Sequence, residues 1–163
     1  MRQSYLLGVY EKSMPNTLSL KEKLTAAKEC GYDFLELSVD ETDEKLSRLD
    51  WTEEQRLSVL TDSRKIGVPI STMCLSGHRK YPLGSENPET AARGMVIMEK
   101  ALKLAQDLGI RVIQLAGYDE YYQPSNEKTR EIFLKNLQRA VEMASAYKVM
   151  LGFETMETPF MDT

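Results

Sequence analysis

Five short apolar runs recur along the chain, and a polar stretch follows each of them. They begin near residues 5, 34, 69, 112 and 149, so the steps between them average roughly 36 residues, enough for one strand and one helix. Each run is close to continuously apolar and is bounded by turn residues, which is typical of buried strands in a parallel sheet. We predict strands over 5–10, 34–39, 69–75, 112–116 and 149–153.

The segments between these runs carry apolar residues at helical spacing and predict four helices. Capping residues, a capping-box spacing and closing glycines mark their ends. The expected end signals are Ser19 and Gly31, Asp50 with Glu53 and Gly67, Asn87 with Pro88 and Gly109, and Ser125 or Asn126. The side chains expected to face the core are Leu20, Leu24, Ala27 and Cys30; Leu57, Leu60 and Ile66; Met95, Met98, Leu102, Ala105 and Leu108; and Phe133, Leu134, Leu137, Val141 and Ala144.

Four strand–helix units and a fifth strand indicate an α/β fold with a parallel sheet. Eight such units would need about 290 residues, close to the size of a (β/α)8 TIM barrel. An open doubly wound sheet is the alternative, but no Gly-rich phosphate loop follows the first strand. We expect residues 1–163 to be the N-terminal part of a single TIM-barrel domain, ending soon after the fifth strand.

Composition narrows the class of protein without identifying its function. The net charge of −4 gives no general attraction to nucleic acid or to anionic membranes. No apolar run is long enough to span a bilayer, and the N-terminus lacks the features of a signal peptide. Cys30 and Cys74 lie far apart, so a disulfide framework is not expected. A cytoplasmic enzyme is the default interpretation.

Glu154 is the leading candidate for chemistry because it stands at the end of an apolar strand. Strand C-termini line the active face of parallel α/β proteins, and a carboxylate there can bind a divalent metal or act as a base. The alternative is that Glu154 only faces solvent. Glu157 is a weaker competitor in the exit loop. Glu36 lies inside the second strand, where it either contacts substrate or forms a buried pair with Lys or Arg.

The loop after the third strand carries His78, Arg79 and Lys80, and cations at the active face suit an anionic group such as phosphate. The alternative for His78, the single histidine, is an exposed loop residue. Tyr118, with two further tyrosines in the loop after the fourth strand, either walls a sugar site or packs on the surface. The acidic group Asp40, Glu41, Asp43 and Glu44 is interpreted as a solvated face.

Several segments resemble one known family of enzymes. The loop Ser76–Ser85, the segment Leu115–Asp119, the strand ending in Glu154 and the segment Leu35–Glu41 are similar to those of the sugar-phosphate 3-epimerases of ascorbate and pentose catabolism. Within that group the chain most resembles the L-xylulose (L-ribulose) 5-phosphate 3-epimerases. The resemblance runs from the first strand to the end of the chain.

The resemblance implies a barrel of the xylose isomerase-like type and a pentulose 5-phosphate substrate epimerised at C3. It also implies a divalent metal, zinc or manganese, bound by two glutamates, an aspartate and a histidine, with the glutamates exchanging the C3 proton. Glu154 would be the first of these glutamates, both metal ligand and catalytic group, and the other ligands would belong to later strands. Substrate contacts would come from Glu36, His78, Arg79 and Tyr118.

Two other functions stay open at this point. A half-barrel would leave two strand edges free and inward apolar residues such as Leu7, Leu37 and Ile113 uncovered, so the chain could self-associate and bind ligand without turnover. We therefore expect a homo-oligomer. An endonuclease-like relative on the same fold is a weaker alternative, because the chain lacks a broad basic stripe. No nucleic-acid or membrane partner is expected.

Overall fold

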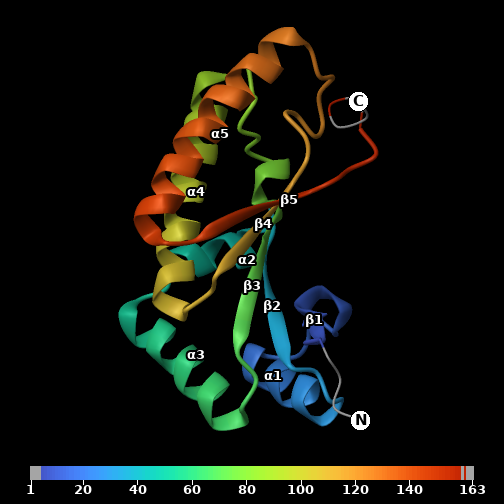
Figure 1. Ribbon diagram of the computed structural model, residues 1–163, viewed down its shortest axis with the longest axis vertical. Helices are drawn as coiled ribbons and strands as arrows, with labels where there is room; N and C mark the ends of the chain where they lie inside the picture. The colour runs from blue at the N-terminus through green and yellow to red at the C-terminus, as the bar shows by residue number, and fades with distance from the viewer. Residues whose placement is uncertain (1–4, 159, 161–163) are drawn as a thin grey trace.

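The computed structural model describes residues 5–158 and 160. Its centre is a sheet of five parallel strands in the order β1-β2-β3-β4-β5, so each strand lies beside its neighbours in sequence (Figure 1). This order with parallel pairing is that of a barrel wall, and it confirms the predicted alternation of strands and helices. The strands are β1 (Gly8–Tyr10), β2 (Phe34–Val39), β3 (Ile70–Leu75), β4 (Val112–Ala116) and β5 (Met150–Glu154).

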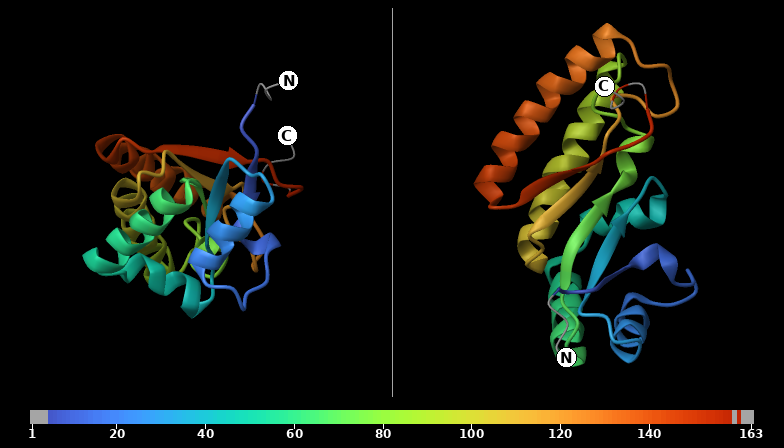
Figure 2. Two further views of the ribbon diagram at one scale, coloured as in Figure 1. Left: turned by 90° about the horizontal axis from the view of Figure 1, so that it is seen from below. Right: turned by 45° about the vertical axis from the view of Figure 1, so that its right-hand side comes forward.

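The larger helices lie together on one face of the curved sheet, and the opposite face is left open (Figure 2). Three short 3-10 helices follow strands or extend a helix near the strand C-termini. The α-helices are α1 (Leu20–Glu29), α2 (Asp43–Leu46), α3 (Glu53–Ile66), α4 (Pro88–Leu108) and α5 (Glu127–Tyr147). The 3-10 helices are η1 (Glu11–Ser13), η2 (Ser47–Asp50) and η3 (Ser76–Arg79).

Local capping explains where most helices begin. Ser19 forms a capping box with Glu22 at the start of α1, and Asn87 accepts from two backbone amides at the start of α4. The predicted start of α3 is wrong by two residues, because its N-cap is Thr52, which forms a capping box with Gln55. Asp50 cannot cap this helix, since it belongs to η2 and its carboxylate pairs with Lys100 of α4.

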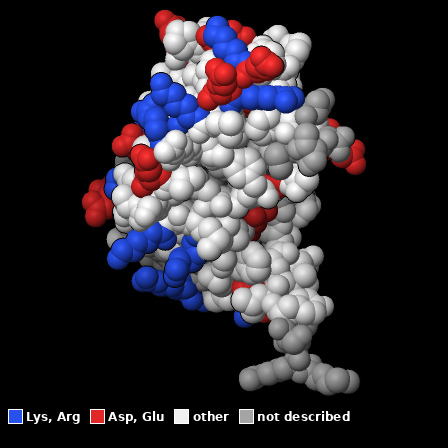
Figure 3. All heavy atoms as spheres, turned by 45° about the horizontal axis from the view of Figure 1, so that its top comes forward, with Lys and Arg blue, Asp and Glu red and all other residues white. Residues whose placement is uncertain are grey.

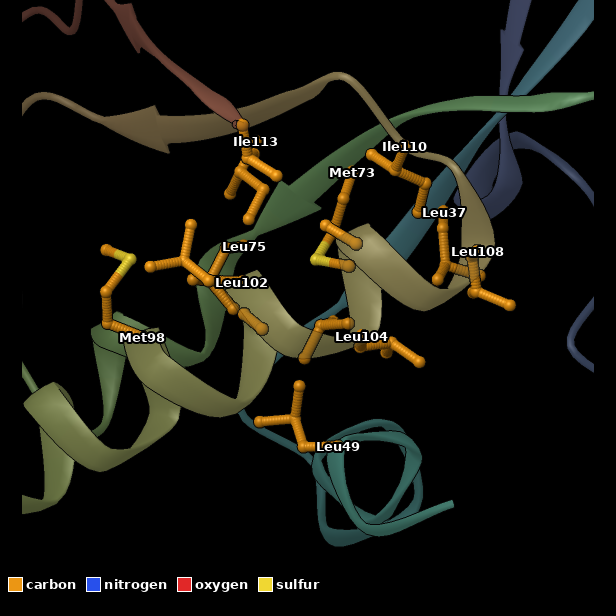
Figure 4. Packing of buried hydrophobic residues seen from close by; sticks show 14 of the residues in the cluster. Leu37, Leu49, Met73, Leu75, Met98, Leu102, Leu104, Leu108, Ile110 and Ile113 are labelled. Carbon is orange, nitrogen blue, oxygen red and sulfur yellow. The ribbon is translucent and has the colours of Figure 1, made fainter. Parts of the chain in front are cut away.

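The core lies between the sheet and the helices, and alternation along each strand decides which side chains enter it. Leu37 and Ile113 are fully buried on the helix side, where Figure 4 shows them among residues of α4. The expectation that they would line an uncovered interior is therefore wrong. The residues that alternate with them, Glu36 and Gln114, line the open face instead. Leu7, by contrast, is 43% exposed.

The predicted stripe of α4 is buried as expected, but parts of the other stripes are not. Leu57 of α3 and both Leu134 and Val141 of α5 are more than half exposed, and Cys30 at the end of α1 is exposed as well. Among the helices and strands, α5 packs mainly against α4 and β5. Residues toward the edges of its stripe therefore stay in solvent, because a helix at the end of a layer has one neighbour fewer.

The charged connection from Asp40 to Asp50 is structured rather than a loop, because it is built around Glu11. Glu11 has no exposed surface. Its carboxylate accepts two bonds from Arg48, at 2.6 and 2.7 Å, and one from Lys45 at 2.7 Å, and Lys23 lies 3.3 Å away. Burial alone would raise the pKa of Glu11, but Arg48, Lys45 and the Ser38 amide lower it to about 2.

Candidate active site

A hollow of about 340 Å³ lies on the open face of the sheet at the C-terminal ends of the strands. We call it the strand-end hollow. Every strand contributes to it, either directly or through the segment that follows. Its polar lining side chains are Tyr10, Lys12, Glu36, Cys74, Ser76, Arg79, Gln114 and Glu154. Because strand C-termini form the active face of this kind of sheet, the strand-end hollow is the candidate active site.

Glu154 lies at the rim of the strand-end hollow, as its sequence position predicts. It is the last residue of β5, and its backbone carbonyl accepts the amide of Gly117 at 3.0 Å, which fixes the strand end against β4. The residue is exposed and therefore free to meet a ligand. The competitor Glu157 is also exposed but does not line the strand-end hollow.

Glu36 lines the strand-end hollow from further toward the N-terminal ends of the strands, since the register makes it level with Thr72, Val112 and Met150, four residues before Glu154. Its backbone pairs with Tyr10 on one side and Thr72 on the other, and its carboxylate accepts the Thr72 hydroxyl at 2.9 Å. Among the described residues no Lys or Arg lies within ion-pair distance of it, so the expected alternative of a buried ion pair is not found. The carboxylate keeps acceptor capacity toward the open face.

Arg79 projects into the strand-end hollow from η3. Its guanidinium carbon lies 4.9 Å from the centre of the Tyr121 ring, a cation–π contact that holds the side chain in place. In the described part of the chain no carboxylate lies within ion-pair distance of Arg79, and its Nε is buried without a hydrogen-bond partner. A positioned cation with unused donors is suited to bind an anion.

His78 lies elsewhere, although it directly precedes Arg79. The ring is buried, and its Nε2 lies 3.1 Å from the carbonyl oxygen of Gly94 in α4. Burial lowers the pKa of His78 to about 4, so the ring is neutral at pH 7 and adds no positive charge. It is neither the exposed loop residue weighed from the sequence nor a lining residue of the strand-end hollow.

Tyr118 is buried beside His78 rather than exposed on the surface. Its hydroxyl makes no hydrogen bond to any described residue, and burial raises its pKa. The ring packs edge-on against Tyr121 at 5.0 Å, and Tyr121 in turn packs against Tyr122, whose hydroxyl donates to Glu41 at 2.8 Å. The three tyrosines thus support Arg79 and join the loops that follow β2 and β4.

Close backbone approaches hold the loop between η3 and α4 in its place. A Cβ on Gly84 would come within 2.5 Å of the Asp119 carbonyl oxygen, and one on Gly94 within 2.6 Å of the Tyr81 carbonyl oxygen. Glycine is required at both positions because any larger residue would push the loop away. The segment 76–85 is one of those that resemble the 3-epimerases. Its glycine at position 84 is explained by the close approach to Asp119.

The sequence analysis did not single out several residues that line the strand-end hollow. Lys12 reaches it from η1 and forms an ion pair with Asp40 at 2.8 Å. Asp40 is buried and also accepts from Thr42, so it is not part of a solvated face as predicted. Cys74 and Gln114 occupy alternate strand positions facing the hollow. The sequence does carry a signal for Cys74 and Gln114, because polar residues at a spacing of two within an apolar strand lie on the same face of the sheet.

The residues that line the strand-end hollow also set its charge. Burial raises the pKa of the Cys74 thiol, and the negative charges of Glu36 and Glu154 add to the effect, so these carboxylates act on the floor of the strand-end hollow. On the face seen in Figure 3, Lys and Arg lie among Asp and Glu toward the top and form one small group at the lower left, and no basic stripe crosses this face. No helix in the described ranges is long and apolar enough to cross a membrane.

A metal site is not complete within the described residues. No group of three or more His, Cys, Asp and Glu side chains in this part of the chain is placed to hold a metal ion. Structural and catalytic metal sites generally use at least three protein ligands. The expected zinc or manganese ion therefore does not fit the described residues by themselves, which offer Glu154 as a single candidate ligand.

Comparison with known proteins defines the class to which this fold and site belong. A model of the xylose isomerase-like TIM barrel matches residues 24–163, so the chain belongs to that family. D-psicose 3-epimerase, solved in the presence of D-fructose, has the same fold with a TM-score of 0.78 at 14% identity over 98% of this chain and 55% of that one. The enzyme from Clostridium cellulolyticum H10, solved with D-tagatose, also scores 0.78, at 16% identity.

Within this family the chain is homologous to L-ribulose-5-phosphate 3-epimerase UlaE. It is 52% identical to the protein of that name from Salmonella heidelberg (strain SL476) and 53% identical to the one from Escherichia coli O139:H28 (strain E24377A / ETEC). Both matches extend over 157 residues and 96% of this chain. The chain spans 55% of the length of each relative, so five of the strands of such a barrel are present here.

Proposed function

We propose that the strand-end hollow is part of the active site of a sugar-phosphate 3-epimerase that interconverts pentulose 5-phosphate epimers at C3. The observation that carries the proposal is the placement of Glu154 and Arg79 in one hollow at the strand C-termini. One is a carboxylate at the rim, and the other is a cation without an ion-pair partner among the described residues. The 53% identity to an L-ribulose-5-phosphate 3-epimerase supports the same substrate class.

Glu154 would act as the base. Its carboxylate takes the proton from C3 of the ketose, and the electrons of that C–H bond move toward the C2 carbonyl to form an enediolate. Inversion then requires a proton from the opposite face of C3. We propose that this second acid comes from the strands that complete the barrel in longer relatives, since β1–β5 form one side of the hollow only. The 163-residue chain alone is therefore expected to be inactive.

The other predicted contacts divide into two groups. Glu36 would accept a hydrogen bond from a substrate hydroxyl, because its carboxylate has capacity beyond the bond from Thr72. His78 and Tyr118 would act indirectly. They would hold η3 and the loop that carries Tyr118, Tyr121 and Tyr122 in place, and so position Arg79. A divalent ion, zinc or manganese, belongs to the proposal only for the complete barrel, with Glu154 as its ligand from this chain.

The test is a chimera in which residues 1–163 replace the matching segment of the E. coli relative. We expect it to epimerise L-ribulose 5-phosphate and to exchange the C3 hydrogen with deuterium from solvent. Glu154→Gln in the chimera is expected to abolish both, while Glu157→Gln leaves them unchanged. A folded chimera that does not exchange, or a Glu154→Gln variant that exchanges normally, contradicts the proposal.

Self-association without catalysis is the second candidate function of the isolated chain. Met150 of β5 and Leu134 and Val141 of α5 are 66%, 58% and 53% exposed, and β5 is an edge strand. Parallel edges with apolar neighbours are surfaces that a second copy can cover. Self-association involves no proton transfer. We therefore expect the isolated chain to associate equally well when Glu154 is replaced.

A further inference from the structure

Gln114 is a polar side chain within an otherwise apolar strand. It lines the strand-end hollow from β4, whereas its neighbours Ile113 and Leu115 are buried on the helix side of the sheet. Among the described residues the Gln114 side chain has no hydrogen-bond partner. A primary amide carries two donors and an acceptor oxygen, so this capacity is available to a ligand in the hollow.

Small residues leave space around the Gln114 amide. Its register partner on β5 is Gly152, which presents no side chain to the open face. A Cβ added at Gly152 would meet, among the described atoms, only Val112, at an ordinary 3.5 Å, so packing within the chain does not require glycine there. Glycine inside a strand often marks a place where a ligand approaches closely. Ala116, the next residue of β4 on this face, is small as well and lines the hollow.

The order of the strands matches the order of the carbons in a pentulose 5-phosphate. β4 lies between β3 and β5 (Figure 1). In the proposed function Glu154, at the end of β5, acts on C3, and Arg79, in η3 after β3, contacts the phosphate on C5. Neighbouring strands lie about 4.8 Å apart, so C4, the carbon between C3 and C5, falls over β4.

The level of Gln114 along its strand places the amide beneath that carbon. Gln114 comes two residues before Ala116, which is the register partner of Glu154. Two residues of a strand span about 7 Å, so the Gln114 backbone lies that much nearer the N-terminal ends of the strands. A C4 hydroxyl directed toward the sheet therefore meets the end of the Gln114 side chain.

We propose that Gln114 binds the C4 hydroxyl and thereby selects the configuration at C4. The inference rests on the proposed function and adds a residue that determines specificity. Epimerisation at C3 leaves C4 unchanged, so the same contact serves substrate and product. In the C4 epimer the hydroxyl points away from the sheet and the amide loses its partner. Cys74, the register partner of Gln114 on β3, offers only a weak donor and acceptor.

Binding to the 163-residue chain tests the contact without requiring turnover. Calorimetric titration compares L-ribulose 5-phosphate with D-xylulose 5-phosphate, which has the same charge and differs only in its configuration at C4. We expect the wild-type chain to prefer L-ribulose 5-phosphate about tenfold, because a site that pairs with a hydroxyl rejects a ligand that cannot supply it. Gln114→Met removes the amide at similar length and should bind the two sugars within about twofold of each other.

Two controls separate this contact from a general effect on the fold. Gln138→Met makes the same change at an exposed position of α5 and should keep the tenfold ratio. An analogue of L-ribulose 5-phosphate that lacks the C4 hydroxyl should bind the wild-type chain and Gln114→Met within about twofold of each other, since the contact is already missing. Damage to the fold would instead weaken all ligands together and leave their ratios unchanged.

The outcomes distinguish this inference from the proposed function. If Gln114→Met keeps the tenfold preference, or if the wild-type chain binds both sugar phosphates equally, the role of Gln114 is overturned and the proposed function stands. If the wild-type chain binds neither sugar phosphate, the role of Gln114 and the substrate class of the proposed function both fail.

Discussion

Glu11 and Arg48 form a two-bonded ion pair, at 2.6 and 2.7 Å, between the end of β1 and η2, with no exposed surface on the carboxylate. Lys45 and Lys23 converge on the same group. The pair joins the first strand of the sheet to the segment that follows the second. Glu11 lies between Tyr10 and Lys12 in the chain, and both of these residues line the strand-end hollow, so the pair supports one of its walls.

The first prediction concerns the pH dependence of folding. The folded-state pKa of Glu11, about 2, lies below its ordinary value of 4.5. The ionised cluster therefore stabilises the fold fully above pH 4.5, and this contribution, on the order of 3 kcal/mol, is lost as the pH falls through about 2. Urea denaturation between pH 2 and 7 measures it.

Glu11→Gln is the matching variant. We expect it to lower the unfolding free energy at pH 7 by about 3–5 kcal/mol, because three cations lose their shared carboxylate. The variant should also lose less unfolding free energy than the wild type as the pH falls below 4.5. Glu22→Gln, on the exposed capping box of α1, is the control. A Glu11→Gln chain that remains as stable as wild type at pH 7 would show that the cluster does not hold the fold.

The second prediction concerns Arg79 in the chimera with the E. coli relative. Arg79→Ala is expected to raise KM for L-ribulose 5-phosphate about tenfold, roughly 1.4 kcal/mol, because a charged contact to phosphate is lost. Arg79→Lys is expected to recover part of it, since the charge remains but the stacking on Tyr121 is weakened. Steady-state kinetics measure KM for each variant. An unchanged KM in Arg79→Ala contradicts a contact between Arg79 and the phosphate.

The third prediction concerns the loop between η3 and α4. Gly84→Ala is expected to destabilise the chain by about 1–3 kcal/mol, because the new methyl group meets the backbone carbonyls of Asp119 and Thr129. Gly152→Ala is the control, since its Cβ would make an ordinary 3.5 Å contact with Val112. Thermal unfolding of the two variants compares them directly. Equal melting temperatures would mean that the loop can move aside.

The fourth prediction concerns association of the isolated chain. Static light scattering over a range of concentrations is expected to show a mass above that of a monomer. Leu134→Lys with Val141→Lys should shift the equilibrium toward monomer, because both side chains are exposed beside the β5 edge. Leu57→Lys, equally exposed on α3, is the control and should have no effect. A wild-type chain that stays monomeric at every concentration excludes this candidate function.

The sequence predicted the order and nature of the elements because those depend on local chemistry. The strand 112–116 and the helix after Asn87 were located from apolar runs, a capping side chain and a following glycine, all of which act within a few residues. The position of Glu154 at a strand end followed from the same reasoning. The predicted start of α3 differs from the observed one by two residues. Asp50 has capping-box spacing to Glu53 in the sequence, but in the structure it pairs with Lys100 and Thr52 caps the helix.

Other features depended on which elements meet in space. Nothing near Glu11 in the sequence indicates that Lys23, Lys45 and Arg48 surround it, since these residues come from three separate segments. His78 was expected at the active face, but the approach of α4 buries it against Gly94.

The sequence by itself determined the strand–helix alternation and the polar residues at the strand ends, because periodicity and capping are local. Only the tertiary structure decided which of these polar residues share a hollow. It places Lys12, Arg79 and Glu154 in the lining of the strand-end hollow and leaves His78 outside that lining. The reason is that strand register and helix packing fix side-chain positions to within an ångström or two, and both are set by contacts between residues far apart in the chain.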